Sequence, residues 1–545
     1  MVQQMDLDHQ TDVVVIGTGA SGCAAAIAAA RSGLEVVQLE KTMTLGGSTT
    51  WSYGLLWVPD LSADEDSDLS DAVSYLRSLG AGGVSEEEAR DYCIAASTAV
   101  EFLGKNGVDF EPLPNIPDHH YPSAPGSREG GRIIAAALFD ARRLGDLQDA
   151  LELSEYVPPG LTWTEVAERG GIASPDAWDE SLWPDGRSDG DYRGFGMSLT
   201  GYLVLGAIDS GVDLRLGHHV TRLILENGRV SGCEVNVSVG EGEAPEVLRV
   251  GARRGVVIAT NGIEGNRDLV LKLEDLPDWE THYPESCNGE GMLMATEAGA
   301  GLRRNRNNFR QKLGYRIPSY NGAPAGFRGA GIQEMAAPRT IVVNRHGRRF
   351  VDESRFQHVA KAMTEYNDTL TGLRNYPCYL VMDRTFFEAN SFAGRPHGAE
   401  PPGWLTRGDD LPALARELGI DADGLVAELD EFNPGARHGQ DPRFDRGSAP
   451  FSNLLGKSKS AGNPNLGPLE TPPFYGVPLV PSGKASIALD IDKYGRVLTL
   501  RGEPVSGLYA CGAAAPTIDR GPGYQAGLGL GQGIAMGCTI GWHMA

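Results

Sequence analysis

The segment 12–40, DVVVIGTGASGCAAAIAAARSGLEVVQLE, decides the fold of this chain. A β-branched apolar run leads into a glycine-rich turn, an alanine-rich helix follows, and a second apolar strand ends at Glu40. In a unit of this kind, Gly17 permits the tight turn, Gly19 lets the backbone approach a pyrophosphate, and Gly22 lets the helix pack closely on the strand. Glu40 stands where a carboxylate accepts hydrogen bonds from ribose hydroxyls, and the helix amino terminus faces the phosphates. The segment therefore predicts a dinucleotide-binding β-α-β unit.

The composition narrows the class of protein. Glycine supplies 72 of the 545 residues, well above its average share of ~7%, which suggests close backbone approaches around a large ligand. The formal net charge of −24 disfavours binding to nucleic acid or anionic lipid. The seven cysteines are scattered and form no CxxC pair, which fits a reducing compartment. Because the chain has no signal-peptide pattern and no apolar run of ~18 residues, we expect a cytoplasmic protein without membrane insertion.

Hydrophobic periodicity predicts further helices, a proline-rich loop and further strands. The helices are expected at 68–79, 85–107, 198–211 and, as two short ones, within 409–433; the loop at 112–126; and strands on both sides of Asn227-Gly228 and at 255–262. Residues 340–354, TIVVNRHGRRFVDES, predict a strand–turn–strand whose turn is Arg345–Gly347. No metal site is predicted, because His119-His120 and His218-His219 are adjacent pairs that point in different directions and lack further ligands nearby.

Seven motifs in order resemble the flavoprotein family of FAD-dependent fumarate reductases and 3-ketosteroid dehydrogenases. They are VVVIGTGASGCAAAIAAARSGLEVVQLEK, LGGSTTWSYGLLWVP, VTRLI, GVVIATNGI, TIVVNRHGRRFVDES, PFYGVPLVP and GRVL with GLYACGAA. The resemblance implies an α/β fold: a Rossmann-like FAD-binding domain formed by residues 1–270 and 441–545, and an inserted α+β catalytic cap domain formed by residues 271–440.

The resemblance also implies which residues meet the FAD. Glu40 would meet the adenosine ribose, Val220 would meet the adenine through its backbone, and the ribityl chain would lie along the segment 41–49. The full set of implied cofactor-binding residues is Gly17, Gly19, Ala20, Ser21, Gly22, Glu40, Lys41, Gly46, Gly47, Ser48, Thr49, Val220, Ala259, Thr260, Gly262, Gly512 and Leu530. Membrane-bound relatives carry a flavin-linking histidine in the LGGSTTWS stretch, which has no histidine here, so we expect FAD to be non-covalent.

Two branches of the family differ in the carbonyl-binding motif. The 1,2-desaturating ketosteroid dehydrogenases carry Y-P-G-P-G, whereas residues 519–523 read DRGPG, with Asp519 at the tyrosine position. The 4,5-desaturating branch carries G-Y-x-S-G-x-x-L-G, which 523–531, GYQAGLGLG, resembles with Ala526 in place of serine. The resemblance therefore points to the Tyr524 hydroxyl and the Gly527 amide as donors to the substrate carbonyl, where they would stabilise a developing enolate.

The proton acceptor has several candidates. Relatives use a tyrosine soon after the NRxGxRF strand, where this chain has Ser354–His358 and no tyrosine. His358 is one candidate base, against the alternative of a packed or solvated histidine. His120 or Tyr121, in a loop that resembles the tyrosine-bearing loop of the ketosteroid branch, is a second candidate, against the alternative of a structural aromatic residue.

The sequence as a whole predicts an FAD-dependent dehydrogenase, or desaturase, of a cyclic ketone, either a 3-ketosteroid or a substituted cyclohexanone. Loss of an α-proton and hydride transfer to flavin N5 would introduce the double bond, and an external electron acceptor would reoxidise the enzyme. A fumarate-reductase-like enoate or enone reductase is one alternative, because Arg328–Gly331 partly echoes the arginine stretch of that branch. A flavin-binding redox protein without catalysis is the other.

Overall fold

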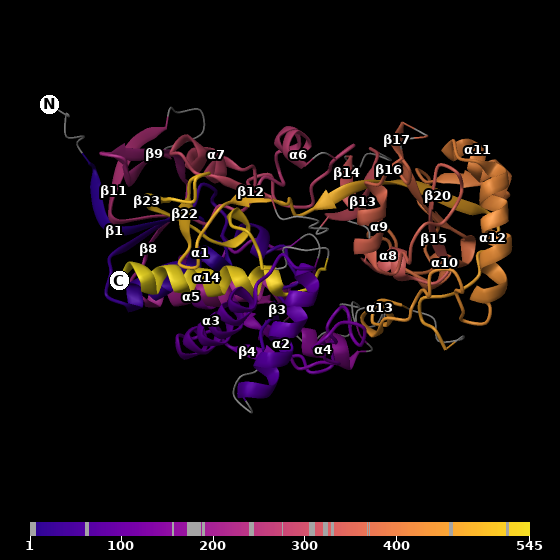
Figure 1. The fold of residues 1–545 in the computed structure, drawn as a ribbon, viewed down its shortest axis with the longest axis horizontal. Coiled ribbons are helices and arrows are strands. Elements are labelled where there is room, and N and C mark those ends of the chain that lie inside the picture. The colour runs from indigo at the N-terminus through magenta and orange to yellow at the C-terminus, as the bar shows by residue number, and fades with distance from the viewer. Residues whose placement is uncertain are drawn as a thin grey trace.

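The computed structural model describes residues 7–59, 65–154, 157–169, 171, 187, 191–238, 245–274, 276–304, 311–319, 325–328, 332–367, 369, 371–456, 462–518 and 523–545. They form two parts that lie side by side along the long axis, each built on its own β-sheet (Figure 1). The expected fold, a Rossmann-like domain with an inserted α+β domain, is confirmed.

The first sheet contains the predicted β-α-β unit at its centre. Its strand order is β22-β23-β11-β1-β2-β8, and β10 and β9 continue from β11. The strands are β1 (His9–Ile16), β2 (Val36–Leu39), β8 (Asp213–Arg215), β9 (His218–Glu226), β10 (Arg229–Val237), β11 (Glu246–Ile258), β22 (Arg496–Leu498) and β23 (Pro504–Ala510). β1 pairs in parallel with both β2 and β11. Ligands bind at the carboxyl ends of such strands, where the glycine-rich turn after β1 lies.

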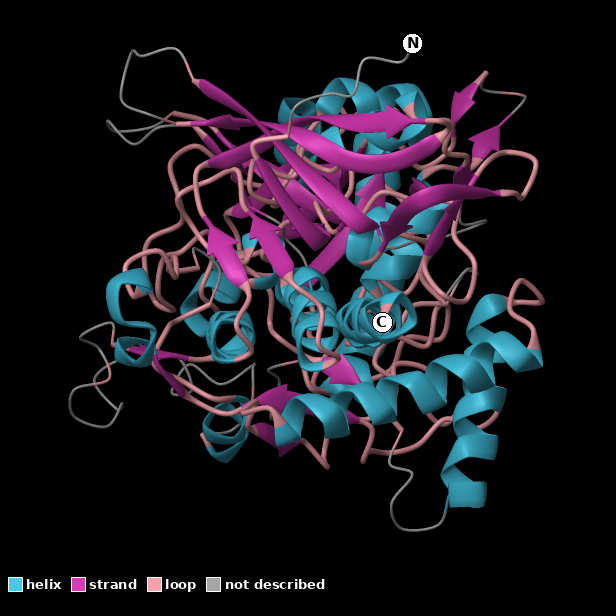
Figure 2. Cartoon of the chain, turned by 90° about the vertical axis from the view of Figure 1, so that its left-hand side faces the viewer, coloured by secondary structure: helices cyan, strands magenta, loops and turns pink. Residues whose placement is uncertain are grey.

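A layer of helices covers one face of this sheet, as Figure 2 shows. In it α1 (Ala20–Arg31) packs directly on α14 (Leu528–Met544). A Cβ atom on Gly537 would lie 2.3 Å from the Ser21 carbonyl oxygen, so the two helices approach at backbone distance only because their contacts are glycine and alanine. The same part holds α2 (Glu65–Gly80), α3 (Glu86–Lys105), α4 (Trp163–Glu168), α5 (Phe195–Asp209), β3 (Leu56–Trp57), β4 (Phe110–Pro112), β5 (Ile133–Ala136), β6 (Phe139–Asp140) and β7 (Tyr192–Arg193).

The second part is built on a sheet of order β14-β13-β20-β18-β15, with β19 beside β20. Its strands are β13 (Gln311–Ile317), β14 (Gly326–Arg328), β15 (Thr340–Asn344), β18 (Cys378–Met382), β19 (Thr406–Gly408) and β20 (Phe474–Gly483). The helices around it are α8 (Ile332–Ala336), α9 (Phe356–Met363), α10 (Arg384–Ala389), α11 (Leu411–Leu418), α12 (Ala422–Ala436) and α13 (Pro450–Asn453), with the short pair β16 (Tyr366–Asn367) and β17 (Gly372–Leu373). The division at residues 270 and 440 stays a prediction, and β20 belongs to this second sheet although it follows residue 440.

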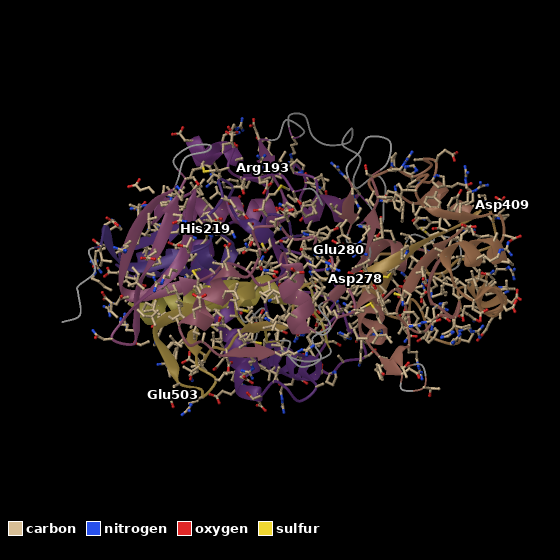
Figure 3. The ribbon with its side chains drawn as sticks, turned by 90° about the horizontal axis from the view of Figure 1, so that it is seen from above. Arg193, His219, Asp278, Glu280, Asp409 and Glu503 are labelled. Atoms are coloured by element: carbon tan, nitrogen blue, oxygen red, sulfur yellow. The ribbon has the colours of Figure 1, made fainter. Side chains whose placement is uncertain are left out.

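The two parts meet through short elements and ion pairs. The connecting elements are α6 (Arg267–Glu274), α7 (Glu290–Glu297), β12 (Leu302–Arg304) and β21 (Ile487–Leu489). Arg316 on β13 forms ion pairs with Asp278 at 2.9 Å and with Glu280 at 2.6 Å. Figure 3 shows both carboxylates near the middle of the molecule, where they join the second sheet to the first part.

Most sequence-based elements form as expected. The helices expected at 68–79, 85–107 and 198–211 correspond to α2, α3 and α5, and Ser85 caps α3 in a reciprocal capping box with Glu88. The β9–β10 hairpin turns at Asn227 and Gly228, both at positive φ, as a tight hairpin turn with its right-handed twist requires.

The strand–turn–strand expected at 340–354 is half wrong. β15 and the turn at Gly347 form, but residues 348–354 join no strand. The side chain of Arg349 is instead buried and forms ion pairs with Glu353 at 2.8 Å and with Asp441 at 2.7 Å, while Arg446 reaches Glu353 at 2.8 Å. A buried charge needs such partners, so this network dictates the path of the chain more strongly than its β propensity does.

Three further observations concern the part of the chain that the structure describes. No helix there is long and apolar enough to cross a membrane. No group of three or more His, Cys, Asp and Glu side chains in those residues is placed to hold a metal ion. All seven cysteines are buried free thiols. The cytoplasmic location stays a prediction.

Candidate functional site

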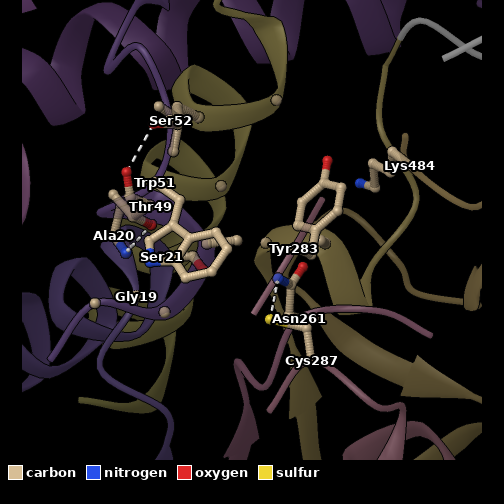
Figure 4. A pocket seen from close by; sticks show the side chains of 18 of the residues that line it. Gly19, Ala20, Ser21, Thr49, Trp51, Ser52, Asn261, Tyr283, Cys287 and Lys484 are labelled. Carbon is tan, nitrogen blue, oxygen red and sulfur yellow. Dashed lines mark hydrogen bonds between the residues drawn. The ribbon is translucent and has the colours of Figure 1, made fainter. Parts of the chain in front are cut away.

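A cavity of about 460 Å³ opens at the carboxyl end of β1 and extends toward the second sheet. One end is lined by the glycine-rich turn, the segment 40–55 and residues of β9, and the other by residues of the second part and the start of α14. Figure 4 shows Trp51 and Tyr283 on opposite walls, with Lys484 on the same side as Tyr283. The same cavity therefore has a nucleotide end and a second end, which contains Tyr524. Because the resemblance implies that Tyr524 meets the substrate carbonyl, the second end is named the ketone end.

The three glycines of the turn differ in what surrounds them. Gly17 has φ +106°, and a Cβ there would lie 2.5 Å from the Ala259 carbonyl oxygen. A Cβ on Gly22 would lie 2.3 Å from the Gly17 oxygen. A Cβ on Gly19 would meet nothing closer than Thr49 Oγ1 at 3.5 Å, because this residue faces the cavity. Gly17 thus permits the tight turn after β1, Gly22 lets α1 pack closely on that turn, and Gly19 leaves room for a ligand.

Glu40 holds the turn in place. Its carboxylate accepts hydrogen bonds from the Thr18 amide at 3.2 Å and the Thr18 hydroxyl at 2.9 Å, and from the Thr42 amide at 3.1 Å and hydroxyl at 3.0 Å. These four donors match the four lone-pair sites of a carboxylate. Glu40 lines the cavity, so a ribose hydroxyl would share oxygens that already organise the glycine-rich turn.

A charged cluster stands beside Glu40. Lys41 Nζ donates to Glu290 at 2.7 Å and to Asn288 at 3.2 Å, and His219 Nε2 lies 3.0 Å from Glu290. Burial acts to raise the pKa of Glu290, but Lys41, Asn288 and His219 together hold that pKa below its ordinary value. Glu290 therefore stays ionised and keeps Lys41 at the cavity wall. His219, labelled in Figure 3, lies at the start of β9.

Fifteen of the seventeen implied cofactor-binding residues line the cavity. They are Gly17, Gly19, Ala20, Ser21, Glu40, Lys41, Gly46, Gly47, Ser48, Thr49, Val220, Ala259, Thr260, Gly512 and Leu530. Gly22 lies behind the turn, and a Cβ on Gly262 would meet the Glu264 carboxylate at 2.7 Å, so neither is a lining residue. Thr260 Oγ1 is buried and has no hydrogen-bond partner among the described residues. An unsatisfied hydroxyl on a wide glycine-lined cradle fits a large polar ligand.

Tyr524 and Gly527 come together at the ketone end. The Tyr524 ring packs edge-on against His119, with centroids 5.2 Å apart, and against Phe356 at 5.7 Å. Gly527 has φ +89°, and a Cβ there would lie 2.4 Å from the Trp57 amide nitrogen, so no side chain fits. Both residues line the cavity at the amino end of α14.

The backbone amides at this helix start have different partners. The Ala526 amide donates to His119 Nε2 at 3.4 Å, and the Leu528 amide donates to the Gln525 carbonyl at 3.4 Å. The Gly527 amide between them has no hydrogen-bond partner in the described part of the chain. Gly527 is only partly buried and lines the cavity, so its amide is available to a ligand oxygen.

The three candidate bases do not line this cavity. His120 and His358 line a small second cavity together with Arg355, and Tyr121 lines neither. Burial lowers the pKa of both His120 and His358 to about 4, and the positive charge of Arg355 adds to the effect. Both imidazoles are therefore neutral at neutral pH. The motif at Asp519 falls on residues that the structure does not describe.

Sequence reasoning missed several lining residues. His119 and Phe451 line both cavities and form the wall between them. Tyr53 also lines the main cavity, and burial raises its pKa; Arg328, which the sequence offered for the reductase alternative, lines the same cavity. The histidine pair at 119–120 was visible in the sequence, but only the fold shows which imidazole faces which cavity. Phe451, about 330 residues away, had no sequence signal.

Comparison with known proteins agrees with this geometry. Residues 12–527 match the family model described as FAD binding domain. The chain is 31% identical to 4-oxocyclohexanecarboxylate 2-dehydrogenase of Sinomonas cyclohexanicum, over 98% of this chain and 92% of that protein. It is 32% identical to 3-oxosteroid 1-dehydrogenase of Mycobacterium tuberculosis, over 98% of each chain. The crystal structure of 3-ketosteroid delta1-dehydrogenase from Sterolibacterium denitrificans, in complex with 1,4-androstadiene-3,17-dione, superposes with a TM-score of 0.84 at 28% identity, covering 98% of this chain and 99% of that one.

Proposed function

Because the chain belongs to the FAD binding domain family and is an FAD-dependent oxidoreductase, we propose that it desaturates the ring of a cyclic ketone beside the carbonyl. The observation that carries the proposal is the unpartnered Gly527 amide beside Tyr524, in the same cavity as the cofactor cradle. A 3-ketosteroid and a substituted cyclohexanone are the two substrate types, since relatives of nearly equal identity are named for each.

The cradle residues fit FAD. Gly19 leaves room for the pyrophosphate, Thr260 offers an unsatisfied hydroxyl, and Lys41 stands at the wall as a cation for a phosphate or a ribityl oxygen. FAD, when bound, supplies the acceptor for a hydride. We propose that it is held without a covalent bond, because residues 45–52 contain no histidine. Heat or acid denaturation should then release intact FAD, and flavin that stays on the denatured chain would contradict this.

At the ketone end the chain polarises the carbonyl. The Tyr524 hydroxyl and the Gly527 amide donate hydrogen bonds to the carbonyl oxygen. These hydrogen bonds strengthen as negative charge develops on that oxygen. The ring then loses a proton from the carbon next to the carbonyl and a hydride from the carbon beyond it. Two neutral donors achieve this without burying a net charge.

His120, His358 and Tyr121 remain our candidates for the proton acceptor. The low pKa values of the two histidines keep them unprotonated at neutral pH, as a base requires. A base in the second cavity reaches the ketone only past His119 and Phe451, which separate the two cavities. Replacing His120 or His358 by alanine and following the pH dependence of flavin reduction tests each of them.

The decisive experiment is anaerobic mixing of the FAD-loaded protein with a 3-ketosteroid, a 4-oxocyclohexanecarboxylate and a saturated dicarboxylate while following flavin absorbance. We expect bleaching by at least one of the ketones. Bleaching by none of them, with reoxidation of the reduced protein by an enoate, would favour the reductase alternative. That alternative draws on Arg328, which lines the same cavity.

A further inference from the structure

We propose that His119 is a positioning residue, whose imidazole holds the segment 523–527 so that the Gly527 amide is the one offered to the substrate carbonyl. The proposal rests on the proposed function, because the carbonyl is the ligand of that amide. No substrate atom need touch His119 for it to act in this way.

Two hydrogen bonds tie His119 to the segment, and a third, from Tyr75, holds Gln525 within it. The Ala526 amide donates to His119 Nε2 at 3.4 Å. The His119 amide donates to Gln525 Oε1 at 2.8 Å, and the same oxygen accepts from Tyr75 Oη at 2.7 Å. Gln525 is almost completely buried, so both donors hold it in a place that water cannot reach. The segment is therefore fixed from α2 and from the loop that carries His119.

The loop itself is anchored in the core. Asp118, next to His119, accepts from Trp57 Nε1 at 2.7 Å and from Arg132 Nη1 at 2.8 Å. Arg132 also forms an ion pair with Asp68 on α2 at 2.7 Å. All four side chains are buried. Fully satisfied buried networks of this kind are rigid, so the position of His119 is set by the core of the first part.

The imidazole has one usable orientation. Its ring packs on Phe451, with centroids 3.5 Å apart, and against the edge of Tyr524. Burial, with the charges of His120 and Arg355, holds the pKa of His119 well below its ordinary value, so the ring is neutral. A neutral ring that accepts at Nε2 carries its proton on Nδ1. The Gln357 side-chain amide lies 3.2 Å from Nδ1, and in this tautomer it must turn its oxygen toward the Nδ1 proton.

The consequence concerns which amide meets the carbonyl. With His119 in place, Ala526 is already bonded and Gly527 is the free donor. Without the Nε2 acceptor, both the Ala526 amide and the Gly527 amide would be unpaired. The segment 523–527 could then rotate so that either amide meets the substrate carbonyl. A small misplacement of a group that orients the reacting atoms costs about 100-fold in rate.

The test compares two substitutions with a matched pair at the far end of α14. His119→Phe keeps a ring but loses the acceptor, whereas His119→Gln places an oxygen near the former Nε2. His543→Phe and His543→Gln are the controls, because His543 is exposed, stacks on Tyr494 and meets Tyr509 edge-on. In the FAD-loaded protein we expect His119→Phe to lower the limiting rate of flavin reduction by the ketone about 100-fold, with a less than threefold change in ketone affinity. His119→Gln should recover most of the rate.

A second measurement does not depend on turnover. Hydrogen exchange of the peptide that spans 523–531 should quicken in His119→Phe and stay near wild type in His119→Gln and both controls. Wild-type rate and wild-type exchange in His119→Phe would overturn the proposal. If no ketone reduces even the wild-type flavin, the proposed function fails and exchange alone decides the positioning role. If His119→Phe does not fold, Gln525→Met removes the shared acceptor and must show the same slowed reduction and faster exchange, or the proposal is wrong.

Discussion

The two ends of the cavity are built in different ways. The nucleotide end is formed mainly by the stretch 16–55, in which Gly22 packs against Gly17 and Glu40 binds Thr18. The ketone end is assembled from His119, residues of α8 and α13, and the start of α14, and hydrogen bonds of His119 join it to the segment before α14. Cofactor binding and ketone chemistry should therefore fail separately when either end is altered.

Tyr524→Phe should separate the functions of the two ends most strongly. Removing one donor to a developing oxyanion lowers turnover by ~10²–10³, so flavin reduction by the ketone should slow by that factor while FAD content stays full. Rapid-mixing absorbance measures both quantities. A tyrosine that only packs against His119 and Phe356 would show less than about a tenfold effect, since a neutral hydrogen bond contributes ~1 kcal/mol. Tyr494→Phe is the matched control on the surface.

Glu40→Ala tests the nucleotide end alone. Hydrogen bonds to a charged group contribute ~1.5–3 kcal/mol, so FAD affinity should fall by roughly 10–150-fold. Part of this loss comes from the turn itself, because Thr18 and Thr42 lose their acceptor. Dialysis followed by flavin quantification measures the loss. Full occupancy after extensive dialysis, or slowed ketone reduction per bound flavin, would contradict the separation of the two ends.

Two glycine substitutions separate packing from ligand space within the nucleotide end. Gly22→Ala should lower the free energy of unfolding of the FAD-free protein by ~1–3 kcal/mol, because its Cβ would lie 2.3 Å from the Gly17 oxygen. Gly19→Ala should leave that free energy nearly unchanged and weaken FAD binding instead, since its Cβ would enter the cavity. Denaturant titration and flavin titration of both variants give the comparison. Equal destabilisation by the two would mean that Gly19 is also a packing glycine.

The smallest expected effect is at Glu290. Glu290→Gln keeps its size but weakens its grip on Lys41, and we expect FAD affinity to fall only several-fold, in line with a half-exposed ion pair worth ~0–1 kcal/mol. The pKa of Glu290 is lowered in the folded chain. The stabilisation that its ionised carboxylate gives to the folded site is therefore complete above pH 4.5 and is lost as the pH falls further. Below that pH, flavin release should therefore depend less steeply on pH in Glu290→Gln than in wild type. Identical release curves would show that another group governs it.

The same contrast explains what could be read from the sequence. Spacing along a single β-α-β unit located the turn with Gly17 and Gly22, where the structure has close backbone approaches, whereas the roles of Gly19 and Glu40 toward FAD stay predictions. The fold class and the hairpin at Asn227 were also predicted correctly. The wall of the ketone end was not predicted, because the sequence does not reveal which of two adjacent histidines faces inward, nor that Phe451 meets His119. The false strand at 348–354 arose in the same way, since the ionic partners of Arg349 lie as far away as Asp441.

The close packing of α1 on α14 also affects the order in which the two parts fold during synthesis. A Cβ on Gly537 would lie 2.3 Å from the Ser21 carbonyl oxygen, so the cofactor cradle is complete only when both α1 and α14 have been made. Contacts between residues so distant in sequence form late, whereas the hairpins and helices of the second sheet have most of their partners closer at hand. On the ribosome, the second part can therefore acquire structure before α14, the last helix of the first part, has been made. We therefore expect flavin capture only after α14 has been made.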